Sequence, residues 1–234
     1  MAVEIIPAIL PRTFKDLCAH LERIRGVSRK VQVDMVGGGL FAFNRTWPFR
    51  GRASFDTIIK EDKGLPYWTE FDVEADLMVD NPKELALSLV RLRTARIIVH
   101  AVRPGALEAA QALADYDDDD HPFPVGVGVA VGVEDPLDIL EPFEHIIDFV
   151  QVMGIAKVGY QGRPFDERAL MQIARLRRRY SHMSIQVDGG VSLKNAHALV
   201  QAGATHLVAG SAVFGAKDTG AALKALYTEA NNQS

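Results

Sequence analysis

Five polar residues that could do acid–base chemistry or bind a cation stand at or just beyond the ends of short apolar runs. Gln32 and Asp34 lie two residues apart, so on an extended strand both side chains point to the same face. Asp76, Lys157 and Asp188 belong to later runs. Three carboxylates converging on one site would be costly unless a cation, a shared proton or a substrate compensates them. The set therefore predicts acid–base chemistry or a cation site, although each aspartate taken singly is better interpreted as a helix cap.

A second chemical feature lies in the segment 184–215, where two apolar runs each end in small residues. The first run ends in an Asp-Gly-Gly turn and the second in an Ala-Gly-Ser turn. Glycine lets backbone N–H groups approach a ligand closely, and a helix starting after each turn would favour an anion. The segment therefore predicts one phosphate held between the two turns, with a carboxylate beside it. The phosphate-binding residues predicted here are Gly189, Gly190, Gly210 and Ser211.

The elements that must position these residues follow from the alternation of short apolar runs with helical patterns, which is typical of βα units around a parallel sheet. Strands are predicted at 3–9, 30–35, 70–79, 95–100, 123–129, 146–153, 184–187 and 205–209. Helices are predicted at 14–25, 54–60, 82–92, 105–114, 136–141, 166–180, 193–202 and 221–229. Pro82 and Pro136 suit first helical positions. Eight units indicate one closed (β/α)₈ TIM barrel over 1–234, with an open doubly wound sheet as the alternative.

The composition is that of an ordinary globular protein. The 234 residues are 48% hydrophobic and 24% charged, with a net charge of −4, which gives no support for nucleic-acid or membrane-surface binding. No apolar run approaches the roughly 18 residues of a membrane span, and the N-terminus does not look like a secretory signal. The single cysteine, Cys18, is interpreted as a buried structural thiol. We expect a cytoplasmic protein that binds a small molecule. Barrels often form homo-oligomers through their outer helices, but no interface is identifiable.

The strand-end residues and their order resemble those of the ribulose-phosphate 3-epimerase family. The matching segments are 6–10, 31–34, 76–82, 152–153, 159–162, 187–190 and 209–212. The resemblance implies a TIM-barrel isomerase that inverts C3 of a phosphorylated ketose, such as ribulose 5-phosphate or xylulose 5-phosphate, through an enediolate. It implies that Asp34 and Asp188 transfer the protons on opposite faces of the sugar, and that a divalent metal stabilises the enediolate. It also adds Gly159 and Gly162 to the predicted phosphate site.

The chain departs from the family pattern at the metal site. Gln32 and Asp76 stand where the family has histidines, whereas the two aspartates are retained as Asp34 and Asp188. Oxygen ligands favour Mg²⁺ or Mn²⁺ over Zn²⁺, so these four residues predict a site for a hard cation if a metal binds at all. Lys157 is a further departure, because it follows the sixth strand where the family generally has asparagine.

Three hypotheses about function follow. The first is an epimerase that acts on a phosphorylated ketose. The second is a lyase or aldolase in which Lys157 forms a Schiff base; Lys157 could instead stabilise an oxyanion, or simply be a surface lysine. The third is a catalytically silent protein that binds phosphosugars, consistent with the loss of both histidines. The segment 37–64 departs most from the family, so the sugar is not identified.

Overall fold

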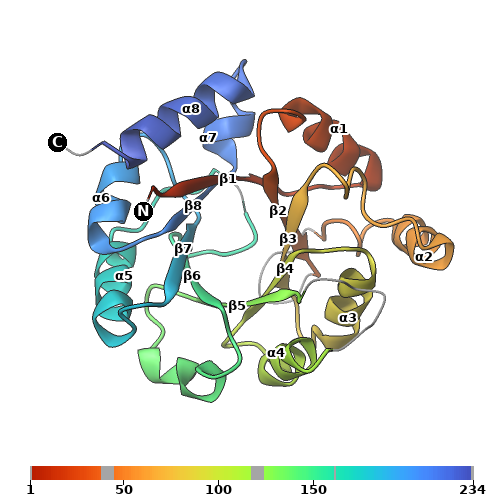
Figure 1. The fold of residues 1–234 in the computed structure, drawn as a ribbon, viewed down its shortest axis with the longest axis horizontal. Helices are drawn as coiled ribbons and strands as arrows, with labels where there is room; N and C mark the ends of the chain where they lie inside the picture. The colour runs from red at the N-terminus through yellow and green to blue at the C-terminus, as the bar shows by residue number, and fades with distance from the viewer. Residues whose placement is uncertain (1, 38–44, 117–123, 161, 233–234) are drawn as a thin grey trace.

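The computed structural model describes residues 2–37, 45–116, 124–160 and 162–232. Eight parallel strands close into a barrel in the order β1 to β8, and β1 pairs with β8 (Figure 1). This closure confirms the predicted (β/α)₈ barrel and is incompatible with an open doubly wound sheet. The strands are β1 Glu4–Ile9, β2 Lys30–Val36, β3 Asp72–Met78, β4 Arg96–His100, β5 Gly126–Val131, β6 Phe149–Met153, β7 Ser184–Asp188 and β8 His206–Ala209.

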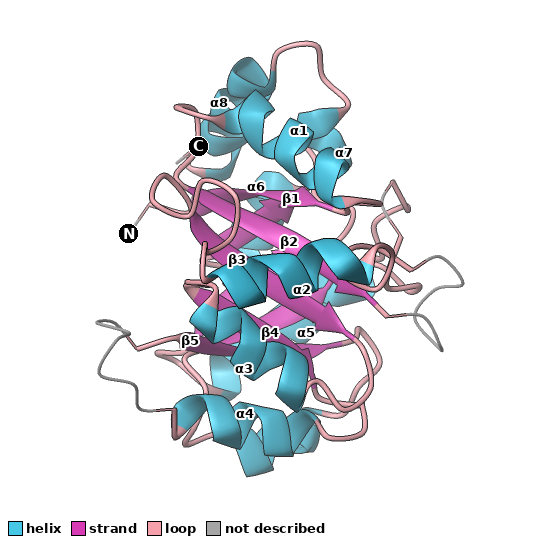
Figure 2. Cartoon of the chain, turned by 90° about the vertical axis from the view of Figure 1, so that its right-hand side faces the viewer, coloured by secondary structure: helices cyan, strands magenta, loops and turns pink. Residues whose placement is uncertain are grey.

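The helices form a ring outside the strands (Figures 1 and 2). They are α1 Phe14–Ile24, α2 Arg52–Glu61, α3 Lys83–Arg91, α4 Ala106–Ala114, the 3₁₀ helix η1 Leu137–Phe143, α5 Arg168–Arg179, α6 Ala196–Ala202, α7 Ser211–Phe214 and α8 Thr219–Ala230. No helix in the described part of the chain is long and apolar enough to cross a membrane.

The core lies between the strands and this ring of helices. The strands are buried almost throughout, which explains their continuous apolar runs. Helix α1 buries Leu17, Leu21 and Ile24, spaced four and three residues apart on one face. Cys18, on the same helix, is half-buried rather than fully buried, and burial raises the pKa of its thiol.

The local structure differs from the predictions at three helices. The segment after β5 forms η1 rather than an α-helix, and Pro142 inside it has no N–H to donate to a preceding turn. Helix α6 begins at Ala196 and not at 193, because Asn195 closes a turn: its side chain accepts from the Ser192 N–H at 2.8 Å and donates to the Gly190 carbonyl at 3.0 Å. The four-residue α7 was not among the predicted helix ranges, although a helix was expected to follow the Ala-Gly-Ser turn.

Candidate active site

A cavity opens at the C-terminal end of the barrel, and it contains most of the predicted site residues. Ala8, Met78, Met153 and Ile155 contribute to its walls. Asp34 and all six predicted phosphate-binding residues also line it: Gly159, Gly162, Gly189, Gly190, Gly210 and Ser211. Asp188, the last residue of β7, lines the same cavity. The fold therefore brings the predicted acid–base pair and the predicted phosphate cradle into one space.

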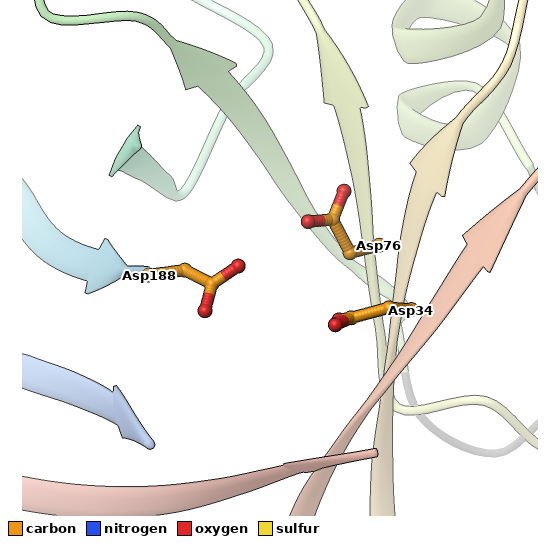
Figure 3. Close-up of side chains that lie close together, drawn as sticks. All are labelled: Asp34, Asp76 and Asp188. Carbon is orange, nitrogen blue, oxygen red and sulfur yellow. The ribbon is translucent and has the colours of Figure 1, made fainter. Parts of the chain in front are cut away.

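Three carboxylates meet in the barrel mouth (Figure 3). Asp34 comes from β2, Asp76 from β3 and Asp188 from β7, and the view shows Asp188 facing the other two from across the barrel. One oxygen from each carboxylate lies within 4.8 Å of the others. All three residues are buried, with exposed fractions of 5%, 0% and 8%. Parallel register explains part of this arrangement, because Asp34 and Asp76 are direct partners on adjacent strands.

The electrostatics of this cluster are unfavourable to negative charge. Burial, followed by repulsion from Asp188 and Asp76, raises the pKa of Asp34 well above its ordinary value, and a hydrogen bond from Gln32 opposes this shift. Burial, followed by repulsion from Asp76, raises the pKa of Asp188 to about 7. A carboxyl group with a pKa of about 7, such as that of Asp188, can both give and accept protons at physiological pH. The same repulsion would be relieved by a bound cation.

Hydrogen bonds from buried side chains orient Asp76 within the cluster. The His100 ring, at the end of β4, lies with Nε2 2.7 Å from Asp76 Oδ1, and Gln151 Nε2 donates to Asp76 Oδ2 at 2.9 Å. Both residues were missed in the sequence, although His100 ends a predicted strand and Gln151 interrupts an apolar run. Asp76, which stands where the resemblance implies a metal-binding histidine, is thus approached by an imidazole from the neighbouring strand.

The Gln32 side chain is hydrogen-bonded on both sides inside the barrel. Its Nε2 donates to Asp34 Oδ1 at 2.9 Å, and its Oε1 accepts from Gln186 Nε2 at 3.1 Å. The amide oxygen is therefore engaged inside the barrel, and the amide nitrogen faces the carboxylates. In this arrangement Gln32 orients Asp34, and one oxygen from each of the three aspartates lies close enough to the others to bind a cation. Whether Gln32 is also a metal ligand stays a prediction.

The phosphate cradle depends on close backbone packing. Gly189 and Gly190 both have positive φ angles, 105° and 70°. A Cβ on Gly190 would lie 2.7 Å from the backbone of Phe165, and one on Gly154 would lie 2.3 Å from the Gly189 carbonyl oxygen. Glycine is required here because any side chain would displace the loops around the cavity. Across the cavity, Ser211 begins α7 directly after β8.

A positively charged side chain that was not predicted from the sequence, that of Arg163, lies beside this cradle. Arg163 lines both the cavity and an adjoining hollow formed with Gly190, Lys194 and Ser211. Its guanidinium lies 4.8 Å from the centroid of the Tyr160 ring. The available signal was a single arginine directly after the glycine-rich loop.

Lys157 lies outside the cavity that contains Asp34 and Asp188. It is exposed, and it lines a separate hollow with Phe165 and Glu167. Of the three interpretations of Lys157, this position favours the surface lysine. A Schiff-base or oxyanion role would require the side chain to enter the carboxylate cavity.

Comparisons with known proteins bear on this site. The model of the ribulose-phosphate 3 epimerase family matches residues 4–214. A chloroplastic ribulose-5-phosphate-3-epimerase of Arabidopsis thaliana is 28% identical over 164 residues, which cover 68% of this chain but only 56% of that relative. A cytoplasmic isoform of ribulose-phosphate 3-epimerase from Oryza sativa subsp. japonica is 26% identical over 228 residues, which cover 96% of this chain and 93% of the relative.

Among solved structures, KGPDC from Streptococcus mutans matches with a TM-score of 0.67 and 14% identity, covering 98% of each chain. At that identity the likeness concerns the fold alone. The family match, by contrast, extends over most of the sequence, from β1 to the end of α7. The chain therefore belongs to the ribulose-phosphate 3-epimerase family.

Proposed function

We propose that this protein inverts C3 of a phosphorylated ketose by proton transfer between Asp34, Asp188 and the sugar. The observation that carries the proposal is the pair of buried carboxyl groups with raised pKa values, which project from β2 and β7 into a cavity that also contains the glycine cradle. Inversion at carbon needs two proton-transfer groups on opposite faces, and each must act as acid in one direction and base in the other.

In the proposed reaction, one aspartate removes the C3 proton next to the C2 ketone, which leaves an enediolate. The other aspartate, in its protonated form, donates a proton to C3 from the opposite face. The pKa of Asp188, about 7, suits this exchange because both protonation states are populated near neutral pH. Hydrogen bonds from Gln32 to Asp34 and from Gln151 to Asp76 hold the carboxyl groups in place.

A divalent cation fits the carboxylate cluster. Three buried oxygens within 4.8 Å of one another are hard ligands, and their repulsion is what a cation would relieve. Asp34, Asp76 and Asp188 would hold it, with Mg²⁺ or Mn²⁺ favoured over Zn²⁺. When bound, such a cation supplies electrostatic stabilisation to the negative charge of the enediolate.

The substrate phosphate is assigned to the cradle at the ends of β7 and β8. Because the glycines carry no side chain there, an anion can approach the backbone of the two turns closely. Arg163 adds a positive charge at the rim of the same cavity. The phosphate at one end and the carboxylates in the barrel mouth would hold the reacting carbon between them.

Deuterium exchange tests this proposal. The protein is incubated with ribulose 5-phosphate in D₂O, with Mn²⁺ or Mg²⁺ supplied, and deuterium at C3 is followed by NMR. We expect exchange and formation of xylulose 5-phosphate by the wild type, and loss of both in Asp34→Asn and Asp188→Asn. Asp62→Asn, which changes an exposed acid at the end of α2, serves as the matched control. No exchange with any supplied metal would contradict the proposal.

The silent phosphosugar-binding protein is the second candidate, and the loss of both family histidines from the metal site favours it. Calorimetric binding of ribulose 5-phosphate without C3 exchange would support it over the epimerase. The lyase hypothesis has less support, since Lys157 lies outside the carboxylate cavity. Borohydride trapping that gave a covalent adduct at Lys157 would reverse this ranking.

A further inference from the structure

A second hollow adjoins the carboxylate cavity and is strongly basic. It shares Gly159 and Tyr160 with that cavity, so the loop after β6 is a common wall of the two spaces. Among the described residues, this hollow is lined by Leu10, Arg12, Arg45, Thr46, Arg50, Gly159 and Tyr160. Tyr160 and Leu10 pack against Met78, whose side chain also lines the carboxylate cavity. The two spaces therefore adjoin one another at Gly159 and Tyr160.

The three arginines of the hollow have no acidic partner within the described parts of the chain. Arg12, Arg45 and Arg50 form none of the ion pairs found there, whereas nearby Arg52 pairs with Asp56 at 2.8 Å. The sequence explains the contrast, because 37–51 contains no aspartate or glutamate. Three guanidinium groups around one hollow repel one another unless an anion lies between them.

Asp16, the acidic residue closest in sequence to Arg12, is already engaged. Its carboxylate accepts the backbone N–H of Arg12 at 2.8 Å and lies 3.1 Å from the His20 ring. It is therefore directed to the backbone of Arg12 and to α1. The positive charge of the hollow is left for a ligand.

The backbone that carries these arginines is fixed to the proposed catalytic strand. The Thr46 hydroxyl donates to the Asp34 carbonyl at 3.1 Å and accepts the Val36 N–H at 2.8 Å. The Trp47 N–H donates to the Pro11 carbonyl at 2.9 Å, which ties this segment to the loop bearing Arg12. Thr46 and Trp47 are both buried. The hollow is thus held in a set position relative to Asp34 by buried hydrogen bonds.

We propose that this hollow binds a second phosphate, so that a ketose bisphosphate is the preferred substrate and binds more tightly than the monophosphate. The proposal rests on the function proposed above and makes its substrate more specific. The first phosphate belongs to the cradle beside β7 and β8, and the arginines stand on the side of β1 and β2. Guanidinium groups suit this role because they bind phosphate oxygens through paired, charge-assisted hydrogen bonds.

Calorimetric titration tests the proposal with two probes, D-ribulose 5-phosphate and D-ribulose 1,5-bisphosphate, at one ionic strength. We expect the wild type to bind the bisphosphate about tenfold or more tightly than the monophosphate, in keeping with added charge-assisted hydrogen bonds. Arg12→Gln, Arg45→Gln and Arg50→Gln should each weaken bisphosphate binding several-fold and leave monophosphate binding unchanged. Arg178→Gln, on the exposed face of α5, is the matched control and should alter neither affinity.

Arg163→Gln distinguishes the cradle from the arginine hollow, because loss of a charge at the cradle should weaken the binding of both sugars equally. All of the substituted arginines are exposed, so their variants should fold, and thermal unfolding checks this. Equal affinity of the wild type for the two sugars, or equal weakening of both by the hollow variants, would overturn the second phosphate and leave the epimerase proposal intact. Failure to bind either sugar would instead overturn the proposed function, and the second phosphate with it.

Discussion

Two layers of polar side chains lie one above the other inside the barrel, and they differ in how their charges are compensated. The lower layer contains Gln32, Glu74, Gln151 and Gln186, and the upper layer contains Asp34, Asp76 and Asp188. Strand register separates them: Gln32 pairs with Glu74, and Asp34, two residues further along β2, pairs with Asp76. Both layers are buried, so burial alone does not distinguish them.

In the lower layer the single carboxylate is satisfied. Glu74 accepts from the Arg96 guanidinium and from Gln186 Nε2 at 3.0 Å, and the Gln186 amide also donates to Gln151 Oε1 at 2.9 Å. Arg96 is held in place by stacking, with its guanidinium 3.5 Å from the centroid of the Phe149 ring. The side chains of this layer are therefore linked by hydrogen bonds and an ion pair, as expected of a structural network in the core.

In the upper layer three carboxylates face one another, and in the described part of the chain no arginine or lysine pairs with any of them. The imidazole of His100 contacts Asp76. The same kind of group is thus stabilised in one layer and left uncompensated in the layer above. The comparison teaches that uncompensated charge, rather than buried charge as such, marks the site where a substrate or cation is expected.

The largest expected effect comes from removing a carboxylate of the upper layer. Asp34→Asn and Asp188→Asn should each lower C3 exchange by roughly 10²–10⁴-fold, the range for loss of a general acid or base. Because the lost group repels its neighbours, neither variant should unfold at a lower temperature than the wild type when chelator is present at pH 8. NMR exchange rates and thermal unfolding are the two measurements. If a variant lost thermal stability together with activity, the upper layer would have a structural role instead of a catalytic one.

Breaking the pair in the lower layer should have the opposite consequence. Arg96→Met leaves Glu74 buried without its cation, and this should cost roughly 3–5 kcal/mol of unfolding free energy. Urea unfolding measures the loss, and the exchange rate per folded molecule should change little. The double variant Arg96→Met with Glu74→Gln, which removes both charges, should regain much of the stability. Equal stability of the single variant and the wild type would refute the structural assignment of this layer.

A divalent cation should stabilise the upper layer selectively. Mn²⁺ at about 100 times its dissociation constant should raise the unfolding free energy by about 2.7 kcal/mol, as for any ligand specific to the folded state. Asp76→Asn, which removes one of the three carboxylates, should abolish most of this increase. Thermal unfolding with and without MnCl₂ measures the effect, and Asp80→Asn, an exposed change outside the cavity, is the control. A similar Mn²⁺ response in both variants would place the cation elsewhere.

The smallest expected effect concerns His206, whose pKa is lowered in part by Arg96, the ion-pair partner of Glu74 in the lower layer. Burial, followed by repulsion from Arg96, lowers the pKa of His206 to about 4. In the upper layer, by contrast, burial and repulsion raise the pKa values of Asp34 and Asp188. The unfolded chain binds a proton at an ordinary pKa near 6.5, so stability is lost as the pH falls from about 6.5 towards 4. The loss should reach roughly 2 kcal/mol at pH 5. Urea unfolding at pH 7.5 and pH 5 should show a shallower pH dependence in His206→Gln, and an unchanged slope would contradict this origin.

Several parts of the fold and site were predictable because they depend on local pattern and chain order. Apolar runs of strand length alternating with helices imply a barrel whose strand ends meet at one mouth. That rule alone brought Asp34 and Asp188 together with the glycine turns of the cradle. Element boundaries moved by a few residues where a side chain capped a turn, as Asn195 does before α6.

The sequence by itself therefore determined the barrel, its polar strand ends and the family, since strand period, chain order and glycine turns are local properties. Only the tertiary structure decided which of those groups touch. It turned the Gln32 amide oxygen towards Gln186, left Lys157 outside the cavity, and gathered Arg12, Arg45 and Arg50 around one hollow. These outcomes depend on register across the barrel and on the path of loops, where residues far apart in sequence meet. No local pattern specifies such contacts, because they arise only when the whole barrel closes.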